Sequence, residues 1–188
     1  MILWTIHSIE ILDLLNKQGY YHGSCEHIDN YFLYAYDWMK KQLAIKTGIN
    51  KEYHPVWAWT KRPDLRKCGN LEKGEKGVLI EFEIDKREVL ISDFDLWHYV
   101  LNYWYLPNSM EDGDKFEEEL KSKGMSYYKQ KPLQEPYDIT IENSWLKIFD
   151  LDWCAEDITS KQDDKIFQAV FWELKLEQIK NIRKFTAK

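Results

Sequence analysis

Residues Ile166 to Phe185 read IFQAVFWELKLEQIKNIRKF and contain a dense apolar run, FQAVFW, over residues 167–172. In an extended segment successive side chains point to opposite faces, and here both faces carry large apolar groups. This pattern predicts a central strand that is covered on both sides. A helix is the alternative, because Leu174, Leu176 and Ile179 could also line a helical stripe. A second strand-like run follows through Ile182 and Phe185.

The chain has 188 residues, enough for one domain that buries roughly 70% of its unfolded surface. Aromatic residues make up 15% of it and include nine tryptophans, more than a globular protein usually has. These rings either fill the core or line a groove for a flat ligand. A formal net charge of -6 argues against general attraction to nucleic acid phosphates, although a local basic patch is compatible with it.

The three cysteines, Cys25, Cys68 and Cys154, form an odd number without regular spacing, which is typical of free thiols. The first residues contain no basic region followed by a long apolar run, and no run approaches the roughly 20 residues of a membrane span. We therefore expect a cytoplasmic protein without a membrane segment. His22, Cys25 and His27 are close in sequence, but no second cluster of matching spacing accompanies them, so no metal site is predicted.

Hydrophobic periodicity and end signals predict an order of strands and helices along the chain. The expected elements are strand Ile2 to Ile6, helix Ile9 to Lys17, a helix from Asp29 to Thr47, strands Val56 to Thr60 and Gly77 to Ile84, and a helix over Leu96 to Tyr103. Val89 to Ile91 is the expected antiparallel partner of the strand Gly77 to Ile84. From about residue 108 to 136 the composition becomes charged, which predicts a surface insertion within a single domain over residues 1–188. The fold class is α+β.

Several common catalytic motifs are absent from the sequence, which has no glycine-rich phosphate loop, no GxSxG, no HExxH and no paired CxxC. Common nucleotide hydrolases, α/β-hydrolases and zinc proteases therefore lack their required residues here. Four segments, LWTI, PVWAW followed by KRPDLR, LISDFDLWHYVLN and FQAVFWELKLEQIK, resemble an uncharacterised family of small bacterial and phage proteins, domain of unknown function 3841. This resemblance covers nearly the whole chain and implies no activity.

The order of elements is also similar, more distantly, to ADP-ribosyltransferases, especially the group that modifies DNA. Their pattern is a first strand with a histidine and a threonine, a helix, an arginine in a turn after an aromatic strand, and a late strand that begins at a catalytic glutamate. Here Thr5 lies in the first strand, Arg62 follows the aromatic strand, and Gln168 opens the late strand. The resemblance implies a split, mostly antiparallel sheet with flanking helices, NAD as the substrate, and transfer of ADP-ribose to an unidentified macromolecular acceptor.

The resemblance also implies a role for individual residues. The catalytic pair would be Arg62, which binds the phosphates of NAD, and Gln168, which positions the ribose. The cofactor would further contact Thr5, Trp57, Trp59 and Tyr99, with Trp57 or Tyr99 stacked on the nicotinamide ring.

This chain departs from the family pattern at two positions. The family histidine that binds the adenosine ribose has no counterpart at Thr5, and His7 lies further along the strand. Gln168 replaces the catalytic glutamate, and an amide forms hydrogen bonds but cannot take a proton. Glu173 would restore a carboxylate only in a different register, because alternation puts it on the opposite face from Gln168.

Each candidate also has a purely structural interpretation. Arg62 suits a solvated turn, and Trp57 and Trp59 suit a core. Asp93 and Asp95 resemble part of an acid–base cluster, yet both occupy positions typical of helix caps. The rival function is therefore a non-enzymatic protein whose acidic surface binds a basic protein partner.

Overall fold

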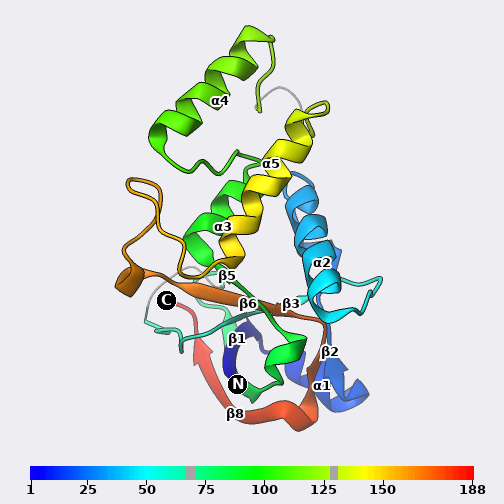
Figure 1. Cartoon of the computed structure of the whole chain (residues 1–188). Coiled ribbons are helices and arrows are strands. Elements are labelled where there is room, and N and C mark those ends of the chain that lie inside the picture. Colours follow the sequence, from blue (N-terminus) through cyan, green and yellow to red (C-terminus); the bar gives the residue numbers. More distant parts are fainter. Residues whose placement is uncertain (67–70, 128–130) are drawn as a thin grey trace. The chain divides into compact units, whose positions relative to one another are not determined.

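The computed structural model describes residues 1–66, 71–127 and 131–188, so the free thiol expected at Cys68 lies outside the described residues. Within them the helices are α1 (Ile11–Gln18), α2 (Leu33–Thr47), α3 (Phe94–Leu101), α4 (Met110–Ser122) and α5 (Tyr137–Trp145). The strands are β1 (Ile2–Ser8), β2 (Tyr20–Tyr21), β3 (Val56–Trp59), β4 (Lys76–Glu83), β5 (Leu90–Asp93), β6 (Phe167–Phe171), β7 (Leu174–Lys175) and β8 (Ile179–Thr186) (Figure 1). The predicted α+β class is confirmed.

The chain forms two compact units. Unit 1 consists of Met1–Asp29, Asp37–Ile91 and Phe167–Lys188. Unit 2 consists of Asn30–Tyr36 and Ser92–Ile166. The charged segment expected to be an insertion, at about residues 108–136, is therefore part of unit 2.

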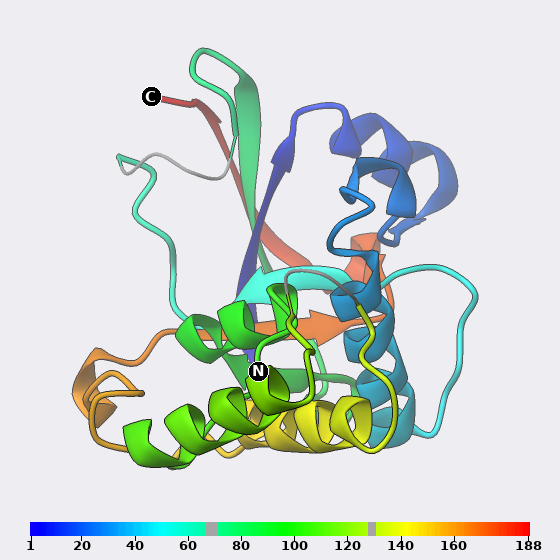
Figure 2. The same cartoon turned by 90° about the horizontal axis from the view of Figure 1, so that it is seen from above.

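The main sheet has the strand order β5-β6-β3-β1-β4-β8, and β2 and β7 form a second, two-stranded sheet. The β1–β4 pairing is antiparallel and runs over seven residue pairs, from Ile2 opposite Glu83 to Ser8 opposite Gly77. In contrast, β1 meets β3 at the single pair Trp4 and Trp59. Figure 2 shows the result, with β1, β4 and β8 running together and β3 and β6 crossing them. The sheet therefore has two halves that are joined at one residue pair.

The predicted partner of the strand Gly77 to Ile84 is wrong. β4 lies between β1 and β8, so both of its edges are taken, and β5 lies at the far end of the sheet beside β6. The chain turns away after β4 through a short 3₁₀ helix, Lys86–Glu88, whose first turn is capped by the Asp85 carboxylate accepting from Arg87 N at 2.9 Å. A charged turn between two apolar runs does not by itself make a hairpin.

The central strand predicted from the opening stretch is confirmed as β6, and the helical alternative is wrong. Residues 168–171 are all buried, as expected for a strand covered on both faces. The second strand-like run is β8, which pairs with β4.

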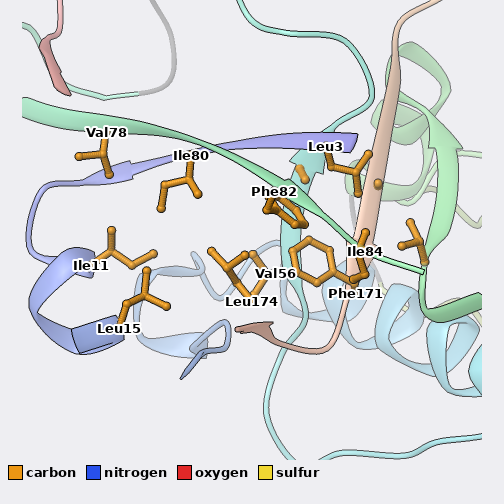
Figure 3. Close-up of a cluster of buried hydrophobic side chains, with 13 residues drawn as sticks. Leu3, Ile11, Leu15, Val56, Val78, Ile80, Phe82, Ile84, Phe171 and Leu174 are labelled. Carbon is orange, nitrogen blue, oxygen red and sulfur yellow. The ribbon is translucent and has the colours of Figure 1, made fainter. Parts of the chain in front are cut away.

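One face of the main sheet packs in unit 1 on α1. Phe82 and Phe171 are fully buried, with ring centroids 5.0 Å apart, and they join the two halves of the sheet. Ile11 and Leu15 of α1 complete the cluster (Figure 3). Gly19 ends α1, with φ 81° and its N–H bonded to Leu15 O at 2.9 Å. A left-handed residue at this position favours glycine.

Unit 2 is built on α3, α4 and α5. Asp93 caps α3 by accepting from Asp95 N at 2.9 Å and Leu96 N at 3.1 Å, which confirms its capping role. α4 begins after Ser109, whose hydroxyl accepts from Asp112 N at 3.1 Å. The charged segment is not bare surface, because α4 buries Phe116 and Leu120 in unit 2.

Candidate functional site

Three of the predicted site residues lie next to one another on the sheet. Trp59 of β3 is paired with Gln168 of β6, and Trp57 is paired with Val170. Because directly opposite residues of an antiparallel pair point to the same face, Trp57, Trp59 and Gln168 share one face. Gln168 is buried and both tryptophans are partly buried.

Thr5 belongs to the opposite face, since Trp4 is the β1 residue paired with Trp59. The Thr5 hydroxyl donates to Trp57 O at 2.8 Å and lies 2.8 Å from His7 Nε2. Its single proton is used on the carbonyl, so His7 Nε2–H is the donor of the second bond. Burial lowers the pKa of His7 to about 4, which keeps its ring neutral near pH 7. The buried Thr5 and the partly buried His7 therefore form a pair away from the face that carries Trp59.

The remaining two predicted residues lie in different units. Arg62 is exposed in the segment after β3, in unit 1. The start of this segment is fixed by Thr60, whose N–H and hydroxyl donate to Phe167 O at 3.2 and 3.0 Å. Tyr99 lies on α3 in unit 2, with its ring 6.2 Å from that of Trp104. Within unit 1, Arg62 thus follows the end of β3 that adjoins the start of β6.

A second group of polar side chains gathers beyond the other end of β6, around Glu173. The Tyr53 hydroxyl donates to Glu173 Oε1, and Lys51 Nζ lies 3.7 Å from the same oxygen. Burial and the neighbouring carboxylate raise the pKa of Tyr53 well above its usual value, so its hydroxyl stays a donor. β6 alone, from Gln168 to Phe171, spans roughly 10 Å. Gln168 and Glu173 therefore occupy different places on the sheet.

Tyr53 is held in place by neighbouring rings. His22 stacks on it with centroids 4.1 Å apart and planes at 17°, and Trp172 meets it edge-on at 6.2 Å. His22 Nδ1 donates to Gly23 O at 3.0 Å. A Cβ atom at Gly23 would lie 2.4 Å from Pro55 O, so only glycine allows the two segments to approach this closely. The stacking of His22 on Tyr53 therefore depends on having a glycine at position 23.

A cavity of about 160 Å³ opens beside Glu173, and its lining includes Lys51, Lys175, Glu88 and Trp172. The two lysines balance the two carboxylates. Ordinary small-molecule pockets have about 300 Å³ or more, so this cavity suits one ring or sugar of a larger ligand. A carboxylate in such a place stabilises positive charge that develops on a bound group, and lysines bind phosphate as point charges.

A family model described as Domain of unknown function (DUF3841) matches residues 2–180. The chain belongs to this family. The match confirms the resemblance carried by the segments LWTI, PVWAW, LISDFDLWHYVLN and FQAVFWELKLEQIK. No curated protein and no solved structure matches the chain. In the described part of this DUF3841 chain, no helix is long and apolar enough to cross a membrane, and no cluster of three or more His, Cys, Asp or Glu side chains could hold a metal ion.

The sequence of this DUF3841 chain indicated Glu173 only as a register alternative and His22 only beside Cys25 and His27, and it gave no indication of Tyr53 or Lys51. These residues meet because the segment at Gly23 approaches Pro55 closely, a contact between segments that are distant in sequence. The one local signal was the run Tyr20-Tyr21-His22-Gly23, in which a glycine directly follows three rings.

Proposed function

We propose that unit 1 binds NAD and breaks the bond between its nicotinamide and its ribose, so that the ADP-ribosyl group passes to an acceptor. The observation that carries the proposal is Glu173, whose carboxylate accepts a hydrogen bond from Tyr53 beside the cavity of about 160 Å³. This is the function implied by the resemblance to ADP-ribosyltransferases, with Glu173 in place of Gln168 as the catalytic side chain.

In the proposed reaction the Glu173 carboxylate stabilises positive charge on the ribose. As the glycosidic bond breaks, its electron pair stays on the nicotinamide nitrogen and positive charge develops on the ribosyl ring. The Glu173 carboxylate stabilises that charge, and the Tyr53 hydroxyl fixes the direction of the carboxylate. An acceptor then forms the new bond to the same ribosyl carbon and loses its proton to Glu173 or to solvent.

The architecture of the sheet also supports the proposal. The single pair Trp4 and Trp59 that links β1 to β3 is compatible with the split sheet that the resemblance implies. Arg62 follows an aromatic strand, as the resemblance requires, and its exposed guanidinium suits a phosphate group. An alternative arrangement within the same function places the ribose at Gln168 and the phosphates at Arg62.

Calorimetric titration with NAD tests the function and separates the two arrangements. If the ligand lies at Glu173, we expect Lys51→Ala to weaken binding about 3- to 10-fold through loss of a phosphate contact. Lys46→Ala, which removes an exposed lysine of α2 that does not line the cavity, is the matched control and should have no effect. If the ligand instead lies at Arg62, Arg62→Ala should weaken binding about 10- to 150-fold.

The variant Gln168→Glu adds a second test. At a ribose site it would supply the catalytic carboxylate and raise NAD cleavage, whereas at a structural position it would bury an unpaired charge and destabilise unit 1. We expect destabilisation, because Gln168 is only 4% exposed. If millimolar NAD gives no heat with the wild type, the non-enzymatic interaction protein becomes the better account.

A further inference from the structure

Unit 2 contains a second cavity, of about 270 Å³, with aromatic walls. Tyr99, Trp104, Tyr105 and Tyr127 line it, and Asp114 and Glu117 bring two carboxylates to its rim. Phe116 fixes two of the walls from behind, because its ring stacks on Tyr105 at 4.2 Å and lies 6.3 Å from Tyr127. The volume is close to the lower end for small-molecule sites, so a compact ligand fits it.

The walls owe their positions to the local backbone. Tyr103, two residues after the end of α3, is a non-glycine residue with φ 59°, and the turned chain lets Trp104 N donate to Tyr99 O at 2.8 Å. This bond places the Tyr99 and Trp104 rings edge to face, 6.2 Å apart at 81°. On the other side, Gly113 of α4 lines the cavity without a side chain of its own. A Cβ atom there would lie 3.3 Å from Pro107 Cγ.

A glycine inside a helix costs about 1 kcal/mol relative to alanine. Gly113 is nevertheless present in α4, where it lines the cavity and packs closely on Pro107.

The charges around the cavity favour a cation. Among the described residues that line it, none is basic. Lys147 Nζ lies 5.8 Å from the Tyr105 ring, but it already donates to Leu106 O at 2.5 Å and Asn108 Oδ1 at 3.0 Å. Glu117 has Lys121 Nζ at 3.3 Å in an exposed pair, and such pairs contribute little.

We infer that this aromatic cavity binds a small organic cation, an ammonium group with a compact apolar body, whose charge faces Asp114 and Glu117. Aromatic faces attract such cations through the ring quadrupole, and tyrosine and tryptophan are suited to this role. Exposed carboxylates at the rim add long-range attraction that salt weakens. The inference concerns unit 2 alone and does not depend on the proposed NAD site.

The test uses choline as the probe and 3,3-dimethylbutan-1-ol, which has the same shape without the charge, as the ligand control. The indole N–H signals of the nine tryptophans are followed by NMR on ¹⁵N-labelled protein, and the signal missing from Trp104→Leu assigns Trp104. We expect choline to shift the Trp104 signal saturably and to bind at least about 5-fold more tightly than the neutral alcohol.

The protein variants separate the rim charges from general acidity. Asp114→Asn should weaken choline binding about 3- to 10-fold, whereas Glu118→Gln, an exposed neighbour on α4 outside the cavity, should not change it. Acetylated trimethyl-lysine amide distinguishes a free small cation from a cation carried by a peptide. If the natural ligand is carried by a peptide, this amide should bind more tightly than choline; if it is a free cation, the amide should not. Equal binding of choline and the alcohol, no saturable shift of Trp104, or an equal effect of both variants would overturn the inference.

Discussion

Replacing Lys165 by methionine removes a positive charge that is enclosed in unit 2. The Lys165 side chain is fully buried, and its Nζ donates to Trp153 O at 2.6 Å and Leu151 O at 3.1 Å. Asp93 Oδ2 lies 3.7 Å away, while the other oxygen of that carboxylate caps α3. One ammonium group therefore ties the loop at 151–153 to the start of α3.

Methionine is apolar and of similar length, so Lys165→Met removes the charge and the donors with little change in packing. Breaking one side of a buried ion pair costs about 3–5 kcal/mol, because the remaining charge stays buried without its partner. Each backbone carbonyl left without a donor costs about 1–3 kcal/mol more, and this penalty overlaps with the cost of breaking the ion pair. We expect a total loss of about 4 kcal/mol, which many domains survive at room temperature.

The assay is urea denaturation of the wild type and the variant, followed by tryptophan fluorescence. Lys161→Met, an exposed lysine nearby, is the control and should change the free energy of unfolding by less than about 0.5 kcal/mol. Asp93→Asn should cost less in the Lys165→Met background than in the wild type, because the two charges are coupled. A loss below about 1 kcal/mol for Lys165→Met, or additive effects of the two changes, would refute the reasoning.

Three further predictions concern unit 1. Phe171→Ala should cost about 3–5 kcal/mol in urea denaturation, since the ring is fully buried against Phe82, and a loss below about 1 kcal/mol would contradict a covered β6. The pKa of His7 is about 4 in the folded chain and 6.5 when unfolded, so its protonation favours unfolding and stability falls as the pH drops from about 6.5 towards 4. His7→Gln should therefore lose about 2 kcal/mol less than the wild type between pH 7 and 4.5, and equal losses would contradict this. Gly23→Ala should separate His22 from Tyr53 and lower the thermal midpoint by several degrees, whereas an unchanged midpoint would argue against the close approach to Pro55.

The parts of the fold that the sequence predicted depend on local periodicity. β6 was recognisable because residues 167–172 are apolar on both faces, and α1 because Gly19 follows an apolar helical stripe. The position of β5 was not recognisable, because strand order depends on which edges other strands occupy. The burial of Phe116 was also missed, since its partners Tyr105 and Tyr127 flank a helix whose own composition is charged.

The candidate site was harder to predict, because it depends on contacts between segments that are distant in sequence. Trp57 and Trp59 could be placed on one face from the sequence because side chains alternate along a strand, whereas Gln168 was grouped with them by the resemblance to ADP-ribosyltransferases. The hydrogen bond between Tyr53 and Glu173 joins residues at the ends of two separate segments, where no periodic pattern applies. Thr5 had been grouped with Trp59, yet the register of β1 puts it on the other face.

The most direct test of the proposed function is the release of nicotinamide from NAD by the wild type and by Glu173→Gln, measured side by side. Glutamine keeps the shape and can still accept the Tyr53 hydrogen bond, so the comparison isolates the carboxylate charge. We predict measurable release by the wild type and a loss of roughly 100-fold or more in the variant, as for other lost electrostatic stabilisers. Equal release by both proteins, or none from the wild type at millimolar NAD, would contradict a catalytic role for Glu173.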